Sequence, residues 1–335
     1  LQINELQLVY VNSVVESVST RAALQRHYSR RRNCDLRDLL GGTDRLITSL
    51  LHLQDTEPGL LLGAYHTLPL PQAVRNEITQ ALIQACSKIK NLVFAVVVTG
   101  LQVVSVVRLK TVVLHPADLH LLCNLVHASD SLRASENWMP ICLPQFDPDG
   151  YLYGHVSYLS EVCDACLLLL TVDKEHFYTL SQAKQKITEK LRRQHVLDKL
   201  VCRGSGGAAT VSGGYPVSTV GCPELRHFVY KNRALAQYTA PIYCPPYHTE
   251  ETRALPVRLY ERLQQRVRCQ ERPLKMLYCS AADHATIAWE TSEFELYAIM
   301  EPLTTKQSAI DIVNKILKYV RQEEQRLFIL NLATF

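Results

Sequence analysis

The hydrophobic pattern near the middle of the chain predicts three consecutive β-strands. Residues 138–143 form a short apolar segment that contains one proline and precedes another, which suits a strand at the edge of a sheet. Apolar and polar side chains alternate over residues 151–158, as expected for a strand with two different faces. Residues 166–172 are continuously apolar, which predicts a strand covered on both faces. A helical pattern over residues 177–200 follows, so this stretch predicts a sheet with helices packed on it.

The segment before these strands predicts helices on either side of a β-hairpin. Residues 1–19 have roughly helical apolar spacing, and Pro71 is a favourable first residue for a helix with one apolar stripe. Two β-branched runs, at 92–98 and 102–107, are separated by Thr-Gly-Leu and predict a hairpin. Pro116 opens a further helix.

The last third of the chain repeats this arrangement. Its expected elements are strands at 217–220 and 227–231, a helix at 256–268 with Tyr260, Leu263 and Val267 inward, a three-stranded meander at 274–280, 285–289 and 295–300, a helix capped by Thr304 with Gln307, and a closing strand at 327–330. The same order of helices and strands therefore occurs twice. This predicts an α/β (α+β) protein with two domains, each a small antiparallel sheet packed with helices.

A glycine-rich segment separates the two repeats. Residues 204–209 read Gly-Ser-Gly-Gly-Ala-Ala, and a second glycine pair follows at 213–214. A phosphate-binding loop needs a following Lys, Ser or Thr and the start of a helix. Here Tyr215 and Pro216 lead into a β-like segment instead. We interpret the segment as a flexible insertion at the domain boundary.

Composition narrows the class of protein. The chain has 335 residues, of which 47% are hydrophobic, and a net charge of +4. The chain is therefore only mildly basic, without the clustered basic residues that are typical of nucleic-acid-binding proteins. Most of the eleven cysteines sit in apolar runs, and no signal peptide is evident, so we expect a reducing compartment. The apolar runs are too short to span a bilayer, and any membrane contact is expected to be peripheral. Since the chain starts at Leu1 within a helical pattern, we expect it to be a piece of a longer protein.

The candidates for chemistry are weak. Cys163 and Cys166 have CxxC spacing, but a structural zinc site needs four converging ligands, and a second such pair is missing. Cys244 and His248 lack further ligands, and no GxSxG nucleophile motif occurs. We interpret His155 as a residue on a sheet face. Asp147 and Asp149, on either side of Pro148, are interpreted as a turn. We therefore expect no cofactor, no metal and no catalytic residues.

One charge pattern points to an interaction surface. Arg258, Arg262 and Arg266 recur every four residues and so line one side of the helix, roughly opposite its apolar side. A solvated face with Glu261 nearby is the simple interpretation. The alternative is contact with anionic lipid or an acidic partner.

A second basic segment lies between two helical patterns. Residues 26–32 end in Arg30, Arg31 and Arg32, and precede a helical pattern at 35–53 that is interrupted by two glycines. The simple interpretation is a solvated linker. The alternative is again contact with anionic lipid, where each basic residue near the surface contributes about 1 kcal/mol.

Six segments in order along the chain resemble the SAND family of vacuolar fusion proteins, also called Mon-one proteins. They are CDLRDLL at 34–40, LHPADLHLL at 114–122, ENWMPICLPQF at 136–146 with HVSYL at 155–159, PELRHFVYK at 223–231, FELY at 294–297 and EEQRLFIL at 323–330. Together they span nearly the whole chain. The glycine-rich segment is a departure, because the corresponding connection of the family looks shorter.

The resemblance implies tandem longin (roadblock-like) domains. Residues 1–22 would be the C-terminal helix of a mostly absent first longin domain, residues 23–205 the second domain and residues 206–335 the third. The family pairs with a Ccz-one-type three-longin subunit to form an exchange factor for Rab-seven-type GTPases on late endosomes, vacuoles and autophagosomes. This is regulation by differential binding rather than covalent catalysis.

The same resemblance implies a division of labour among the domains. The exchange surface would belong to the first domain, and the second and third would serve subunit assembly, contact with a third regulatory subunit and attachment to a phosphoinositide-rich membrane. An alternative is a scaffold subunit of another three-longin complex, of the ciliary Fuzzy type or the lysosome-related-organelle type. An enzyme acting on small molecules would require a pocket with strongly shifted ionisable groups.

Overall fold

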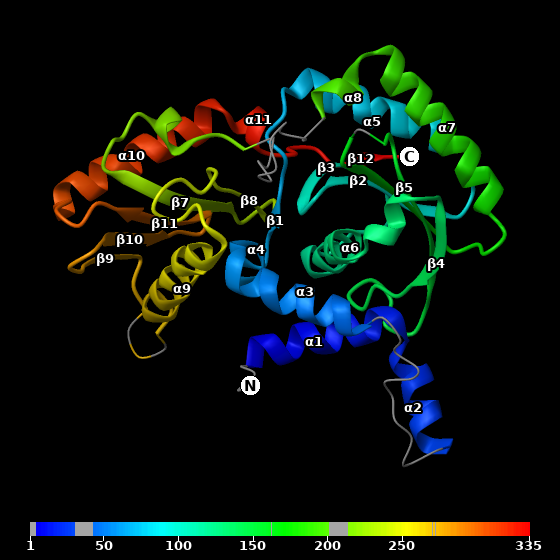
Figure 1. Cartoon of the computed structure of the whole chain (residues 1–335), viewed down its shortest axis with the longest axis horizontal. Coiled ribbons are helices and arrows are strands. Elements are labelled where there is room, and N and C mark those ends of the chain that lie inside the picture. Colours follow the sequence, from blue (N-terminus) through cyan, green and yellow to red (C-terminus); the bar gives the residue numbers. More distant parts are fainter. Residues whose placement is uncertain (1–4, 31–42, 162, 201–213, 270, 272) are drawn as a thin grey trace. The chain divides into compact units, whose positions relative to one another are not determined.

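The computed structural model describes residues 5–30, 43–161, 163–200, 214–269, 271 and 273–335 (Figure 1). The chain forms two compact units. Unit 1 comprises Leu1–His52, Gln72–Ser212 and Asn331–Phe335, and unit 2 comprises Leu53–Pro71 and Gly213–Leu330. Each unit contains one sheet with helices on both faces, so the predicted α/β class with two small sheets is confirmed.

The sheet of unit 1 has the strand order β12-β3-β2-β6-β5-β4. Its strands are β2 (Leu92–Thr99), β3 (Gln102–Arg108), β4 (Asn137–Ile141), β5 (Leu152–Tyr158), β6 (Ala165–Thr171) and β12 (Ala333–Thr334). All neighbours are antiparallel except β12, which pairs parallel with β3. The expected hairpin, β2–β3, and the three consecutive strands expected near the middle of the chain, β4, β5 and β6, are therefore present.

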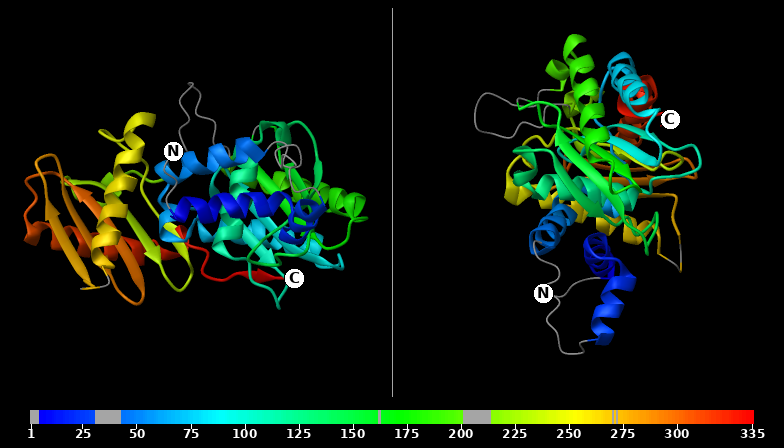
Figure 2. Two further views of the ribbon diagram at one scale, coloured as in Figure 1. Left: turned by 90° about the horizontal axis from the view of Figure 1, so that it is seen from below. Right: turned by 90° about the vertical axis from the view of Figure 1, so that its right-hand side faces the viewer.

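The helices of unit 1 lie on both faces of this sheet. They are α1 (Glu5–Val18), α2 (Arg21–Arg30), the first part of α3 (Thr43–Thr56), α5 (Gln72–Cys86), α6 (Pro116–Ala128), the 3₁₀ helix η2 (Asp130–Arg133), α7 (Phe177–Arg193) and α8 (Val196–Lys199). Helices α5 and α7 cover one face, and α6 covers the other (Figures 1 and 2). Every residue of β2 and β6 is buried, as expected for central strands covered twice.

The sheet of unit 2 has the order β1-β8-β7-β11-β10-β9. Its strands are β1 (Tyr65–His66), β7 (Leu225–Asn232), β8 (Gln237–Thr239), β9 (Met276–Ser280), β10 (Ala285–Glu290) and β11 (Phe294–Met300). The strands β9, β10 and β11 form the predicted meander, and β11 continues antiparallel to β7. Only β1 joins parallel, along β8.

The helices of unit 2 are α4 (Pro58–Leu62), the 3₁₀ helix η3 (Val217–Val220), α9 (Glu250–Val267), α10 (Lys306–Gln322) and α11 (Glu324–Leu327). Helix α9 packs on one face of the sheet, where Tyr260 and Leu263 join Tyr297 in one apolar cluster. Helix α10 packs on the other face, where Ile312 joins Phe228 in a second cluster. Unit 2 thus has three layers, with α9 and α10 on opposite faces of its sheet.

Two short segments depart from the expected domain ranges 23–205 and 206–335. Residues 53–71 belong to unit 2 and supply β1, while residues 331–335 belong to unit 1 and supply β12. Both strands join a sheet edge in parallel, which an adjacent hairpin connection cannot achieve. The assignment of residues 1–22 to a first longin domain stays a prediction.

Several local predictions were wrong. Residues 217–220 form a 3₁₀ helix because the N–H of Thr219 bonds the carbonyl of Pro216. The strand expected at 327–330 is instead the end of α11 and an irregular stretch. The cap of α10 is Thr305, whose hydroxyl accepts from the N–H of Ser308.

The start of α9 was also placed too late. The helix begins six residues before Pro256, because Thr249 provides a start where its carbonyl accepts from the N–H groups of Thr252 and Arg253. Pro256 therefore lies inside the helix and removes a single backbone donor.

Candidate interaction surfaces

The cationic stripe, which consists of Arg258, Arg262 and Arg266, lies on the outer side of α9. All three side chains are exposed, while the opposite side of α9 is buried against the sheet. The predicted division of this helix into an apolar and a cationic side is therefore confirmed. Whether the stripe binds lipid or a partner stays a prediction.

Nearby cations are used within the fold instead. Glu290 and Glu295 are 9% and 3% exposed. Arg268, directly after α9, bonds Glu290 at 3.2 Å and Glu295 at 2.6 Å. Arg233 reaches the same two carboxylates at 2.8 and 3.0 Å, and Lys231 reaches Glu295 at 3.1 Å. Buried charges require such pairing, so these three cations are structural.

Arg258 and Arg262 are different, because neither has an ion pair or hydrogen bond within the residues that the structure describes. Arg266 donates to the Cys279 thiol of β9 at 3.0 Å and is therefore turned toward the edge of the sheet. The stripe thus has two unpaired members and one that contacts β9.

Sequence reasoning missed an apolar residue beside the stripe. Leu255 is 47% exposed and precedes Arg258 by three residues, so both lie on the same side of α9. The signal was available in the helical spacing, but the helix was expected to begin at Pro256 and Leu255 was left outside it. An apolar residue next to unpaired cations suits a surface that contacts both headgroups and acyl chains.

The second basic segment is only partly described. Arg30 is exposed in the last turn of α2, in unit 1, and thus belongs to a helix rather than to a linker. Arg31 and Arg32 lie outside the described residues, as does most of the glycine-rich segment. The structure therefore does not test whether these arginines form a surface.

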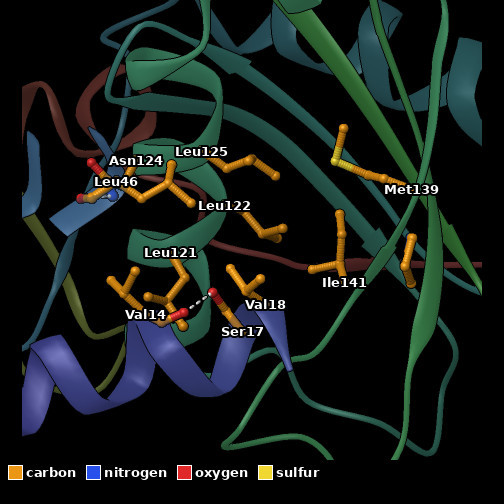
Figure 3. Close-up of a pocket in the computed structure, with 11 residues that line it drawn as sticks. Val14, Ser17, Val18, Leu46, Leu121, Leu122, Asn124, Leu125, Met139 and Ile141 are labelled. Carbon is orange, nitrogen blue, oxygen red and sulfur yellow. Dashed lines mark hydrogen bonds between the residues drawn. The ribbon is translucent and has the colours of Figure 1, made fainter. Parts of the chain in front are cut away.

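A cavity of about 230 Å³ in unit 1 lies between α1, α3, α6 and β4 (Figure 3). It is lined by Val14, Ser17, Val18, Leu46, Leu121, Leu122, Asn124, Leu125, Met139, Pro140 and Ile141. None of these side chains is ionisable, and the Ser17 hydroxyl donates to the carbonyl of Val14. The shifted ionisable groups that would support an enzyme are not found in this cavity.

His155 is a residue on a sheet face, as predicted. It is fully buried, and its Nε2 lies 2.9 Å from Oε2 of Glu136, whose Oε1 accepts from Lys184 at 3.1 Å. Burial alone would raise the pKa of the Glu136 carboxyl, but hydrogen bonds from Ser181, His155 and Lys184 lower that pKa to about 2. Burial lowers the pKa of His155. The three side chains form a partly buried hydrogen-bonded network, in which Nδ1 of His155 has no partner within the described residues.

The cysteine and acidic candidates serve the fold. Cys163 donates to the carbonyl of Leu200 at 3.5 Å, and burial raises the pKa of the Cys166 thiol to about 12. Burial also raises the pKa of the Cys163 thiol, so both thiols are protonated at neutral pH, which is unsuitable for nucleophilic chemistry. Asp147 accepts from the N–H of Asp149 at 3.1 Å, which confirms the turn. The described residues contain no cluster of three or more His, Cys, Asp or Glu side chains arranged to hold a metal ion.

No helix within the described ranges is both long and apolar enough to cross a bilayer.

Comparison with known proteins matches each of the two units to a domain family. Residues 90–189 match the family described as the second longin domain of FUZ, MON1 and HPS1, and residues 224–324 match the third longin domain of the same proteins. The tandem longin architecture expected from the resemblance is therefore confirmed.

Similar full-length proteins are named as vacuolar fusion proteins. The chain is 41% identical to vacuolar fusion protein MON1 homolog A of Gallus gallus over 98% of its own length and 58% of the relative. It is 40% identical to Protein SAND of Takifugu rubripes, covering 99% of this chain and 62% of that protein. Identity to the Homo sapiens MON1 homolog A is 39%, over 98% of this chain and 49% of the relative. The chain thus spans about half to three-fifths of the length of these relatives.

Proposed function

Because the chain belongs to the MON1 (SAND, Mon-one) family of vacuolar fusion proteins, we propose that it is part of a subunit of a heteromeric guanine nucleotide exchange factor. The GTPase would be of the Rab-seven type, on late endosomes, lysosomes or vacuoles, in membrane fusion and autophagy. The observation that carries the proposal is the similarity to MON1 proteins over 98% of this chain, together with its two longin domains.

The described residues would serve assembly and membrane attachment rather than exchange itself. By the family resemblance, exchange belongs to a first longin domain, and the two domains matched here are the second and third. The partners would be a Ccz-one-type three-longin subunit and a third regulatory subunit. Exchange would proceed by preferential binding of a nucleotide-free GTPase, without covalent chemistry.

The membrane contact would use the unpaired part of the cationic stripe. Arg258 and Arg262 are exposed and unpaired among the described residues, and Leu255 lies beside them with 47% of its surface exposed. Exposed cations gain about 1 kcal/mol each near an anionic leaflet. A neighbouring apolar side chain adds burial in the interface between headgroups and acyl chains. These features support peripheral binding to phosphoinositide-rich membrane.

The exchange proposal is tested by nucleotide release. The full-length protein is co-expressed with a Ccz-one-type subunit, and release of a fluorescent nucleotide from a Rab-seven GTPase is measured on anionic liposomes. The present 335-residue chain replaces the full-length protein in the comparison. We expect release with the full pair and not with the shorter chain. A stable complex that releases no nucleotide would favour a scaffold subunit of another three-longin complex.

A further inference from the structure

The edge strands β4 and β9, each at one end of its own sheet, are protected differently. Strand β4 ends the sheet of unit 1 and contains Pro140, which cannot donate a backbone hydrogen bond to an added strand. Strand β9 ends the sheet of unit 2 and reads Met-Leu-Tyr-Cys-Ser, with neither proline nor a charged residue (Figure 1). Its first four residues are half-buried and Ser280 is exposed. The edge of β9 therefore lacks the protection that β4 has.

The register of β9 shows which backbone groups face outward. The N–H of Glu290 bonds the carbonyl of Lys275 at 2.8 Å, and the N–H of Ala281 bonds the carbonyl of His284 at 2.9 Å. Hydrogen-bonded pairs alternate in an antiparallel ladder, so Leu277 also bonds β10.

By the same alternation, the backbone groups of Met276, Tyr278 and Ser280 point away from β10. Within the described part of the chain, no strand pairs with this side of β9. Three residues therefore offer free N–H and carbonyl groups to an extended segment.

The two faces beside this edge have different chemistry. On the α9 face, Leu277 and Cys279 pack against the α9 cluster, and Arg266 donates to the Cys279 thiol at 3.0 Å while remaining exposed. Lys275, directly before β9, is also exposed and, like Arg266, is positively charged. This side of the edge is therefore positively charged.

On the α10 face the edge is apolar. Met276 and Tyr278 pack against the α10 cluster, and the Tyr278 hydroxyl donates to the carbonyl of Thr304 at 2.5 Å. Leu303, which directly precedes Thr304 in the chain, is 94% exposed, the largest exposed fraction among the described large apolar side chains.

We propose that β9 binds an extended segment of a partner protein by adding it as a further strand. Side chains of a strand alternate between two faces. The bound segment would place acidic residues beside Arg266 and Lys275, and apolar residues beside Tyr278 and Leu303. Backbone hydrogen bonds to Met276, Tyr278 and Ser280 would supply the pairing, and the alternating pattern would supply specificity. The inference rests on the geometry of unit 2 and does not depend on the proposed exchange or lipid binding.

Charge argues against a second copy of this chain as the occupant. Two β9 strands that pair antiparallel around a twofold axis normal to the sheet keep corresponding faces on the same side. The two Arg266 side chains would then lie on one face of the joined sheet, and like charges across such a pairing repel. An acidic segment removes this repulsion.

The test uses the whole chain and synthetic peptides. A fluorescent peptide of alternating Glu and Val is titrated with the protein and followed by anisotropy, and a Lys–Val peptide of equal length is the charge control. Ser280→Pro removes one outward N–H that the β9–β10 ladder does not use, and Ser280→Ala is its matched control. Arg266→Glu reverses the charge at the edge, and Lys318→Glu makes the same change of charge at an exposed position on α10. Thermal unfolding is measured for every variant to establish that it is folded.

The expected result is saturable binding of the Glu–Val peptide and much weaker binding of the Lys–Val peptide. Ser280→Pro and Arg266→Glu should each weaken binding about tenfold, while Ser280→Ala and Lys318→Glu leave it within about twofold. Equal binding of both peptides, or unchanged binding by folded Ser280→Pro, would overturn the proposal. So would a concentration-dependent dimer in sedimentation that Ser280→Pro abolishes, because the occupant would then be a second copy.

Discussion

The side-chain amide of Gln237 makes two hydrogen bonds to the backbone of Ile329. Its Oε1 accepts from the N–H of Ile329 at 2.9 Å, and its Nε2 donates to the carbonyl of the same residue at 2.9 Å. The remaining donor of the amide reaches the hydroxyl of Tyr65 at 2.8 Å. The buried side chain of Gln237 therefore takes the place of a neighbouring strand. The backbone N–H and carbonyl of Ile329, in the irregular stretch after α11, are hydrogen-bonded without any β-pairing.

Replacing Gln237 should destabilise unit 2 strongly. Gln237→Leu leaves the N–H and carbonyl of Ile329 buried without partners, and each such group costs about 1–3 kcal/mol. We expect the free energy of unfolding to fall by about 2–4 kcal/mol in urea titrations. Gln265→Leu is the control, because Gln265 is exposed and its side chain hydrogen-bonds only to Glu261 among the described residues. Equal stability of the two variants would contradict this role.

His227 should make the stability of unit 2 sensitive to acid. Burial lowers the pKa of His227 to about 3, and its ring lies between the Tyr260 hydroxyl at 2.6 Å and the carbonyl of Pro241 at 3.2 Å. A stacked ring, Tyr243, also faces it. The neutral imidazole can donate to the carbonyl through Nε2 and accept at Nδ1, whereas the charged form has no acceptor left for the Tyr260 hydroxyl.

The sign follows from the lowered folded-state pKa. The unfolded chain takes up a proton near pH 6.5, while the folded state does so only near pH 3, so stability present above pH 6.5 is lost as the pH falls through this window. His227→Gln should show a smaller loss of unfolding free energy between pH 7 and pH 4 than the parent chain. Parallel pH profiles for both proteins would show that His227 does not titrate in this way.

Arg258, in the middle of α9, and Arg268, directly after that helix, should differ in their effect on stability. Arg268→Ala removes a shared partner of the buried Glu290 and Glu295, and we expect a loss of about 1–3 kcal/mol because Arg233 and Lys231 still compensate in part. Arg258→Ala removes an exposed, unpaired charge and should change stability by less than about 0.5 kcal/mol. Thermal and urea unfolding of the two variants would test this contrast, and equal losses would refute it.

The lipid hypothesis predicts a loss of membrane binding that depends on position. Arg258→Glu with Arg262→Glu should weaken co-sedimentation with anionic liposomes by about tenfold or more at low salt. Lys315→Glu with Lys318→Glu is the matched control, because both lysines are exposed on α10, on the other face of the sheet of unit 2. If both pairs weaken binding equally, the effect comes from net charge alone. Unchanged binding by the α9 pair would exclude this helix as the contact.

Local patterns were sufficient for most elements. The β-branched runs of β2 and β3, the continuously apolar β6 and the inward stripe of Tyr260, Leu263 and Val267 all occur where their periodicity predicts them. In these segments the hydrophobic pattern and the backbone preference of the residues favour the same secondary structure, so the local sequence is enough to predict it. The errors fall at the ends of helices and in short segments, such as Val217–Val220, where turn geometry rather than periodicity decides.

The sequence by itself determined the class of fold, the order of the main helices and strands, and the cationic side of α9. Only the tertiary structure decided how three arginines of one region are used. Arg268 pairs with buried carboxylates, Arg266 contacts β9 and Arg258 has no described partner. The reason is that Glu290 and Glu295 lie more than twenty residues beyond α9. The helical periodicity of α9 therefore cannot predict which arginine pairs with these carboxylates. The same holds for Ile329, because its partner Gln237 lies on a distant strand.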